Sequence, residues 1–118
     1  MNKEKLKDRT KKFAHRCVKL AMSLPESDIG RHIRRQLIKC STSVAANYRA
    51  TCLAQSRASF ISKISIVLEE TDESFFWLEF IVDERLMEIK LIESLIKEAE
   101  ELTAIFISSR KTANSKNE

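Results

Sequence analysis

Residues 60–82, FISKISIVLEETDESFFWLEFIV, carry the most regular pattern in the chain and decide its fold. Apolar or small residues recur there in alternating steps of four and three, at Phe60, Ile64, Val67, Thr71, Ser74, Leu78 and Ile81. A second line flanks the first every seven residues, at Ile61, Leu68, Phe75 and Val82. Because this spacing puts both lines on one side of a helix, the segment is predicted to be a core helix with a wide apolar face.

The rest of the chain also favours helix. Its 118 residues include 1 Gly and 1 Pro, so turns are scarce, and helix-forming residues dominate. Similar spacing predicts three more helices. The first covers about residues 3–23, and the second begins at Ser27 or Asp28 and ends between 50 and 55. The last follows a break at 83–85, and its apolar face is expected to include Ile89 and Leu91. Pro25 ends the first helix, and Ser56 is placed to cap the third.

Four helices joined by short links predict an all-α fold, an antiparallel up-and-down four-helix bundle. We expect a single domain over residues 1–110 and a frayed polar tail over residues 111–118. No apolar run approaches the roughly 20 residues of a membrane span, and the charged N-terminus differs from a signal peptide. These features predict a cytoplasmic protein with no membrane partner.

No catalytic, metal or cofactor motif is present. The best candidate for such chemistry is an acidic cluster, Glu69, Glu70, Asp72 and Glu73. Helical di-iron sites need Glu-x-x-His pairs from two helices, and His15 and His32 have no such partner. Cys17, Cys40 and Cys52 lack C-x-x-C spacing and are expected to be reduced core residues. We therefore expect no enzyme activity, no cofactor and no small-molecule substrate.

Positive charge is concentrated near the N-terminus. Residues 1–40 contain 12 Lys and Arg against 4 Asp and Glu, a net charge of +8, whereas the remaining residues sum to −4. Two interpretations stay open: an anionic partner, or pairing of basic helices with acidic helices inside the bundle. For a nucleic acid, the candidate phosphate contacts are Lys11, Lys12, Arg31, Arg34, Arg35 and Lys39.

Three aromatic residues fall outside the core face of residues 60–82, namely Phe76, Trp77 and Phe80. Large exposed apolar patches are unusual in monomers, so a neighbouring helix or another subunit has to cover them. We expect these residues to form the interface of a homo-oligomer.

Two segments carry a more specific pattern: QLIKCSTSVAANYRA at 36–50 and SRASFISKISIVLEETDESFFWLE at 56–79. They resemble the four-helix-bundle family encoded in intervening sequences of bacterial 23S rRNA genes, also labelled S23 ribosomal protein. The looser similarity extends from about Arg9 to Thr112. Ser59 stands where that family usually has an acid. The matching positions are Gln36, Ser43, Asn47, Tyr48, Arg49, Ser56, Arg57, Phe60, Lys63, Glu70, Asp72, Glu73 and Trp77.

The resemblance implies a bundle that commonly assembles as a ring-like homopentamer. Related accessory proteins of diversity-generating retroelements are more strongly basic, and they bind a reverse transcriptase and nucleic acid through a basic surface. The implied partners are therefore further copies of the chain and RNA or a nucleic-acid enzyme such as a reverse transcriptase.

Polar residues of the motif are expected to link the second and third helices, with Asn47, Tyr48, Arg49 and Arg57 facing the acids between Glu70 and Glu73. The complete predicted network is Gln36, Ser43, Asn47, Tyr48, Arg49, Arg57, Lys63, Glu70 and Glu73. The leading hypothesis is a non-enzymatic homo-oligomer that binds structured RNA or an RNA-handling partner. The alternative is a structural or protein-interaction module with no nucleic-acid role.

Overall fold

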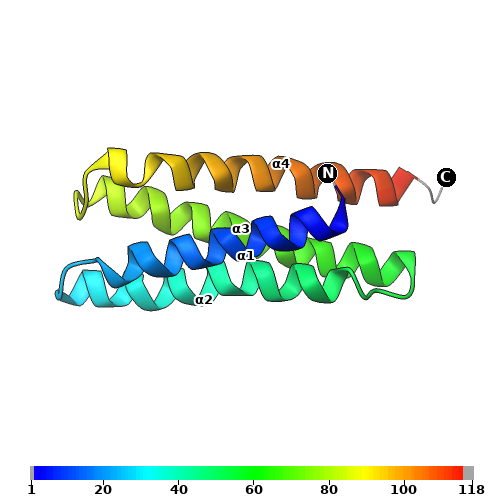
Figure 1. The fold of residues 1–118 in the computed structure, drawn as a ribbon, viewed down its shortest axis with the longest axis horizontal. Coiled ribbons are helices and arrows are strands. Elements are labelled where there is room, and N and C mark those ends of the chain that lie inside the picture. The colour runs from blue at the N-terminus through cyan, green and yellow to red at the C-terminus, as the bar shows by residue number, and fades with distance from the viewer. Residues whose placement is uncertain (1, 116–118) are drawn as a thin grey trace.

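The computed structural model describes residues 2–115, which form four long helices and no strand. The helices are α1 (Lys3–Met22), α2 (Asp28–Thr51), α3 (Arg57–Asp83) and α4 (Glu93–Ser115), with a short 3-10 helix, η1 (Ile89–Leu91), before α4. Successive helices run in opposite directions along the long axis (Figure 1). The predicted all-α four-helix bundle is confirmed.

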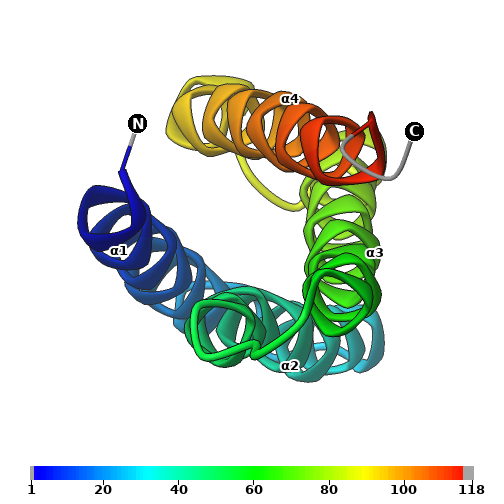
Figure 2. The same cartoon turned by 90° about the vertical axis from the view of Figure 1, so that its right-hand side faces the viewer.

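Seen end-on, neighbouring helices in the sequence are neighbours in space, and the order around the bundle is α1, α2, α3, α4 (Figure 2). The molecule measures 49 × 21 × 19 Å. Fully buried side chains from every helix fill the centre, among them Phe13, Ile33, Leu78 and Phe106. No helix within residues 2–115 is both long and apolar enough to cross a lipid bilayer.

Side-chain caps define where α2 and α3 begin, as the sequence predicts. The Ser27 hydroxyl accepts a hydrogen bond from the Gly30 N–H at 3.1 Å, and the Ser56 hydroxyl accepts one from the Ser59 N–H at 3.0 Å. Gly30 is required here for a steric reason, because a Cβ at this position would lie 2.0 Å from the Pro25 carbonyl oxygen. The turn between α1 and α2 therefore folds directly onto the first turn of α2.

The link between α3 and α4 is longer than predicted. Arg85 adopts a positive φ of 55°, and the Leu86 N–H donates to the Ile81 carbonyl at 3.1 Å, which closes α3. The chain then makes only the single 3-10 turn η1, where three residues per turn break the α-helical spacing. Ile92 is fully buried, but Ile89 and Leu91 are 56% and 61% exposed, so the prediction that they join the apolar face of the last helix is wrong.

The C-terminal end of α4 also differs from the prediction. The helix continues to Ser115, so residues 111–115 of the expected frayed tail are helical. The remaining residues of that tail, 116–118, lie outside the described residues.

The three cysteines are free thiols. Cys17 and Cys40 are fully buried, as expected for core residues, whereas Cys52 is only half-buried beside the core. Burial raises the pKa of the Cys17 thiol to about 12. Burial is also the main cause that raises the pKa of Cys40 to about 11, although the nearby Ser74 hydroxyl opposes it. At neutral pH both groups are therefore protonated and poorly nucleophilic.

Long polar side chains connect the two ends of the chain across the α1–α4 side. Arg9 donates from Nε and Nη2 to the two Glu98 carboxylate oxygens, both at 2.7 Å, and from Nη2 to Glu101 at 3.2 Å. Hydrogen bonding to Glu98 holds the pKa of Arg9 above its ordinary value. Arg16 donates to the Ser94 hydroxyl at 2.8 Å. The contact between α1 and α4 thus depends on bidentate and charge-assisted hydrogen bonds.

Candidate nucleic-acid interface

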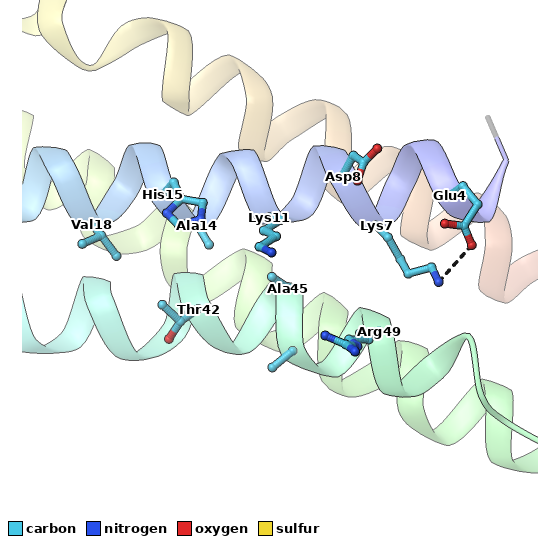
Figure 3. Close-up of a pocket in the computed structure, with 11 residues that line it drawn as sticks. Glu4, Lys7, Asp8, Lys11, Ala14, His15, Val18, Thr42, Ala45 and Arg49 are labelled. Atoms are coloured by element: carbon cyan, nitrogen blue, oxygen red, sulfur yellow. Dashed lines mark ion pairs between the residues drawn. The ribbon is translucent and has the colours of Figure 1, made fainter.

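A surface groove of about 620 Å³ lies between α1 and α2 and is called here the α1–α2 groove. Small side chains form its floor, because Ala14 and Val18 of α1 face Thr42, Ala45 and Ala46 of α2. Charged and titratable groups form its rim: Glu4, Lys7, Asp8, Lys11, His15 and Arg49. Figure 3 shows Lys7 and Lys11 pointing from α1 toward α2.

The rim has more positive than negative groups. Lys7 is paired with Glu4 at 2.9 Å, as Figure 3 shows. Within residues 2–115, Lys11 and Arg49 form no ion pair with a carboxylate. Their side chains are exposed and flank an apolar floor, which is an arrangement suited to an anionic partner with a flat or apolar part.

Two of the six predicted phosphate contacts have partners within the chain. The Arg34 guanidinium donates to the carbonyls of Ala21 at 3.2 Å and Leu24 at 2.9 Å, and pairs with Glu26 at 2.6 Å. It therefore binds one carbonyl in the last turn of α1 and one in the turn that follows the helix. Arg31 pairs with Asp28 at 2.8 Å. Arg34 is a structural residue, and its predicted role as a phosphate contact does not fit this geometry.

The same ion pairs set the charge of the turn between α1 and α2. Hydrogen bonding to Arg34 holds the pKa of Glu26 below its ordinary value. These pairs neutralise Arg31 and Arg34 within the turn and α2, so they are not a pairing of a basic helix with an acidic one. Pairing between helices is seen instead at Arg9 of α1, which binds Glu98 and Glu101 of α4.

The other four predicted cations, Lys11, Lys12, Arg35 and Lys39, are exposed. Lys11 belongs to the α1–α2 groove. Burial and the neighbouring Glu73 raise the pKa of Glu70 on α3, and the positive charge of Lys39 opposes this rise. Lys12 and Arg35 form no ion pair within the described part of the chain.

The predicted polar network is only partly brought together. Asn47 donates to the Ser43 carbonyl of its own helix at 2.9 Å. Gln36, Ser43, Lys63 and Glu70 are half-buried, and Glu73 is exposed.

Three members of that network lie elsewhere. Tyr48 is buried and packs against Phe106 of α4, with ring centroids 5.6 Å apart. Arg49 lines the α1–α2 groove, on the side of α2 that faces α1. Arg57 begins α3, about 20 Å along the helix axis from Glu70, so it cannot reach that carboxylate in its own chain. The predicted pairing of these arginines with the α3 acids is wrong for this reason.

The three predicted interface aromatics form one cluster with His32 of α2. The Trp77 ring lies edge-on to His32 and to Phe76, with centroid distances of 5.5 Å and 4.9 Å. The Phe80 ring centroid lies 5.8 Å from that of Trp77 and 5.8 Å from that of Phe76. The Trp77 Nε1 atom is buried, and it has no hydrogen-bond partner among the described residues. Trp77 is therefore largely covered by its own chain, whereas Phe76 is 50% exposed.

The groove residues Lys7 and His15 were not predicted as site residues from the sequence, and Arg49 was predicted only as a member of the polar network. The feature of the sequence that could have indicated the groove is the line of small residues on α2, because Ala45 and Ala46 leave space beside α1. Within residues 2–115, no three His, Cys, Asp or Glu side chains are grouped closely enough to hold a metal ion.

The family described as 23S rRNA-intervening sequence protein matches residues 2–108, which is nearly the whole chain. The chain belongs to this family. Its fold is similar to the crystal structure of a protein of unknown function from the S23 ribosomal protein family of Bacteroides thetaiotaomicron VPI-5482, with a TM-score of 0.85 and 32% sequence identity. That similarity covers 94% of this chain and 99% of the other. Among curated proteins, none matches this chain.

Proposed function

We propose that this 23S rRNA-intervening sequence protein is a non-enzymatic homo-oligomer of the cytoplasm, a pentamer by analogy, that binds structured RNA through its α1–α2 face. The observation that carries the proposal is the α1–α2 groove, whose cations Lys11 and Arg49 have no ion-pair partner within residues 2–115. Lys12 and Arg35 extend the cationic surface beyond the groove. The family description names an intervening sequence of 23S rRNA and no ligand, so RNA is chosen as the anion by analogy with the nucleic-acid-binding relatives that the resemblance implies.

The mode of binding follows from the residue types. Lysine and arginine on helices neutralise phosphates without reading base edges, so binding depends on the shape of the RNA and weakens steeply with salt. Association of several copies multiplies the cationic surface. An RNA-handling protein that holds such an RNA, for example a reverse transcriptase, is a compatible second partner.

Salt titration of RNA binding tests the proposal. The probe is a fluorescent hairpin from a 23S rRNA fragment, and the variant is Lys11→Glu with Arg49→Glu. Removal of two phosphate contacts lowers the slope of log affinity against log salt by about 2. The matched control, Lys97→Glu with Lys111→Glu, makes the same change in net charge on the exposed side of α4 and leaves the slope near that of the wild type.

A structural or protein-interaction module is the second candidate, and the internal ion pairs of Arg31 and Arg34 favour it. It predicts no affinity for any structured RNA at low salt. It also predicts that protein binding survives charge reversal at Arg31 and Lys39, where the structure tolerates it, but is lost when Trp77 or Phe80 is replaced.

A further inference from the structure

Apart from the α1–α2 groove, two surfaces of the described chain combine exposed apolar side chains with a charged rim. The first, called here the α3 patch, is centred on Phe76, which is 50% exposed and lies beside Phe80 with ring centroids 5.8 Å apart. Along α3, four exposed acids lie within two helical turns of Phe76, at Asp72, Glu73, Glu79 and Asp83. The α3 patch is thus an aromatic surface with a negative rim.

The second surface is a groove of about 390 Å³ between the end of α1 and the beginning of α4, called here the α1–α4 groove. Its lining residues are Arg16, Lys19, Leu20, Ser23, Met87, Leu91, Ser94 and Leu95. Leu91 is 61% exposed, and the nearby sequence positions Met22 and Ile89 are 63% and 56% exposed. The charged members of the lining are both cations, so this is an apolar surface with a positive rim.

The two surfaces complement each other in polarity and in charge. Contact of the α3 patch with itself in a second copy would bring two sets of acids together, and contact of the α1–α4 groove with itself would bring Arg16 and Lys19 against the same residues. Like-charge contacts of this kind disfavour a symmetric pairing. A head-to-tail contact instead puts carboxylates beside cations and covers Phe76 and Leu91 at once.

The position of the surfaces in the bundle favours a closed assembly. They lie on different sides, because the groove involves α1 and α4 and the patch lies on α3, which Figure 2 shows across the bundle from α1. Both are near the end that carries the α1–α2 turn and the α3–α4 link (Figure 1). Repeated head-to-tail contact at one level adds copies side by side with little rise along the long axis, and such a series forms a ring when the rotation between copies closes.

We propose that the α3 patch of one copy docks in the α1–α4 groove of the next copy. This inference rests on the self-association in the proposed function and names the two surfaces that produce it. The α1–α2 groove lies outside the contact and stays open to RNA. Phe76 and Leu91 are the central residues of the two sides.

Mixing two half-defective variants tests the proposal. Phe76→Asp destroys the patch, Leu91→Asp destroys the groove, and both sites are exposed, so circular dichroism should show folded helical proteins. By sedimentation velocity each variant alone should associate at least roughly 30-fold more weakly than the wild type. An equimolar mixture should give a one-to-one complex that does not grow, because it contains one intact patch facing one intact groove.

Leu53→Asp is the matched control, since Leu53 is 75% exposed in the turn at the opposite end of the bundle, and this variant should associate like the wild type. A charge exchange gives an independent readout. Arg16→Glu with Lys19→Glu should weaken association, and addition of Glu79→Lys with Asp83→Lys in the same chain should restore it.

Three results would overturn the proposal: a monomeric wild-type protein, normal assembly of Leu91→Asp while Phe76→Asp is monomeric, or no complex in the mixture. The second result would assign Phe76 to a symmetric contact and leave self-association intact. RNA affinity is measured separately on the Leu91→Asp protein, so loss of RNA binding and loss of this interface are distinguishable.

Discussion

The two helical hairpins of this bundle are closed in different ways. In the α1–α2 hairpin, residue type determines the turn: Ser27 caps α2, Gly30 lets the Pro25 carbonyl approach, and Arg34 binds the carbonyls of Ala21 and Leu24 where α1 ends. In the α3–α4 hairpin, the backbone closes the helix at Arg85 and a longer link follows, with Ile89 and Leu91 exposed. The first turn is held by specific contacts, and the second presents an apolar surface.

The hairpins also differ in how their charges are used. Around the α1–α2 turn, arginines pair with acids and with carbonyls, so positive charge there contributes to folding. On α3, Glu70 lies among Glu69 and Glu73, and its raised pKa reflects burial and like-charge repulsion. Net charge alone therefore does not indicate which part of a helix is available to a partner.

The largest expected effect is at the first turn. Gly30→Ala should lower the free energy of unfolding by about 2–3 kcal/mol, because the new methyl overlaps the Pro25 carbonyl and the turn must move. Urea denaturation followed by circular dichroism measures it. Asp28→Ala, at an exposed position of the same helical turn, should cost less than about 1 kcal/mol. Equal effects of the two variants would show that the close approach of the Pro25 carbonyl to Gly30 does not constrain the turn.

Arg34→Ala should cost about 2 kcal/mol, because it removes a guanidinium that is bound to two carbonyls and to Glu26. Arg34→Lys keeps the charge, but a single ammonium group cannot reproduce the planar set of donors, so it should recover only part of the loss. Full recovery by lysine in thermal denaturation would contradict the structural role of the guanidinium.

The ion pair that connects the two hairpins should contribute less to the free energy of unfolding than the contacts of the α1–α2 turn. A double-mutant cycle with Arg9→Ala and Glu98→Ala should give a coupling energy of about 1 kcal/mol, since the pair is bidentate and mostly shielded, with 22% and 16% of the side chains exposed. High salt should reduce this coupling only slightly. A coupling near zero would mean that α1 and α4 are held together by apolar contacts alone.

The smallest expected effect is a stabilisation of the fold, and it should follow a substitution at Glu70 of α3. The folded-state pKa of Glu70 lies above its ordinary value of 4.5, so its ionised form disfavours the folded state at neutral pH. Glu70→Gln should therefore slightly raise the melting temperature at pH 7. The difference should shrink as the pH falls through the raised pKa and disappear below about 4.5, where the wild-type carboxyl is protonated in both states. Glu69→Gln, at a more exposed position, is the control.

Much of the fold follows from local patterns in the sequence. The four-and-three spacing predicts α3 and its buried face, Pro25 predicts the end of α1, and Ser27 and Ser56 predict the helix starts that are observed. These predictions are possible because helix periodicity and capping involve residues within one or two turns of each other. The late start of α4 was missed because a single 3-10 turn changes the spacing over only a few residues.

The site depends more on the tertiary structure. The sequence alone determined that the N-terminal half is basic, that the acids gather near Glu70, and that Phe76 lies off the core face. Only the packed structure decided which cations are already paired, placing Arg34 on the end of α1 and Arg49 beside Lys11 in the α1–α2 groove. The reason is that an ion pair or a groove is made by residues far apart in the chain, and their distances are fixed only when the helices pack.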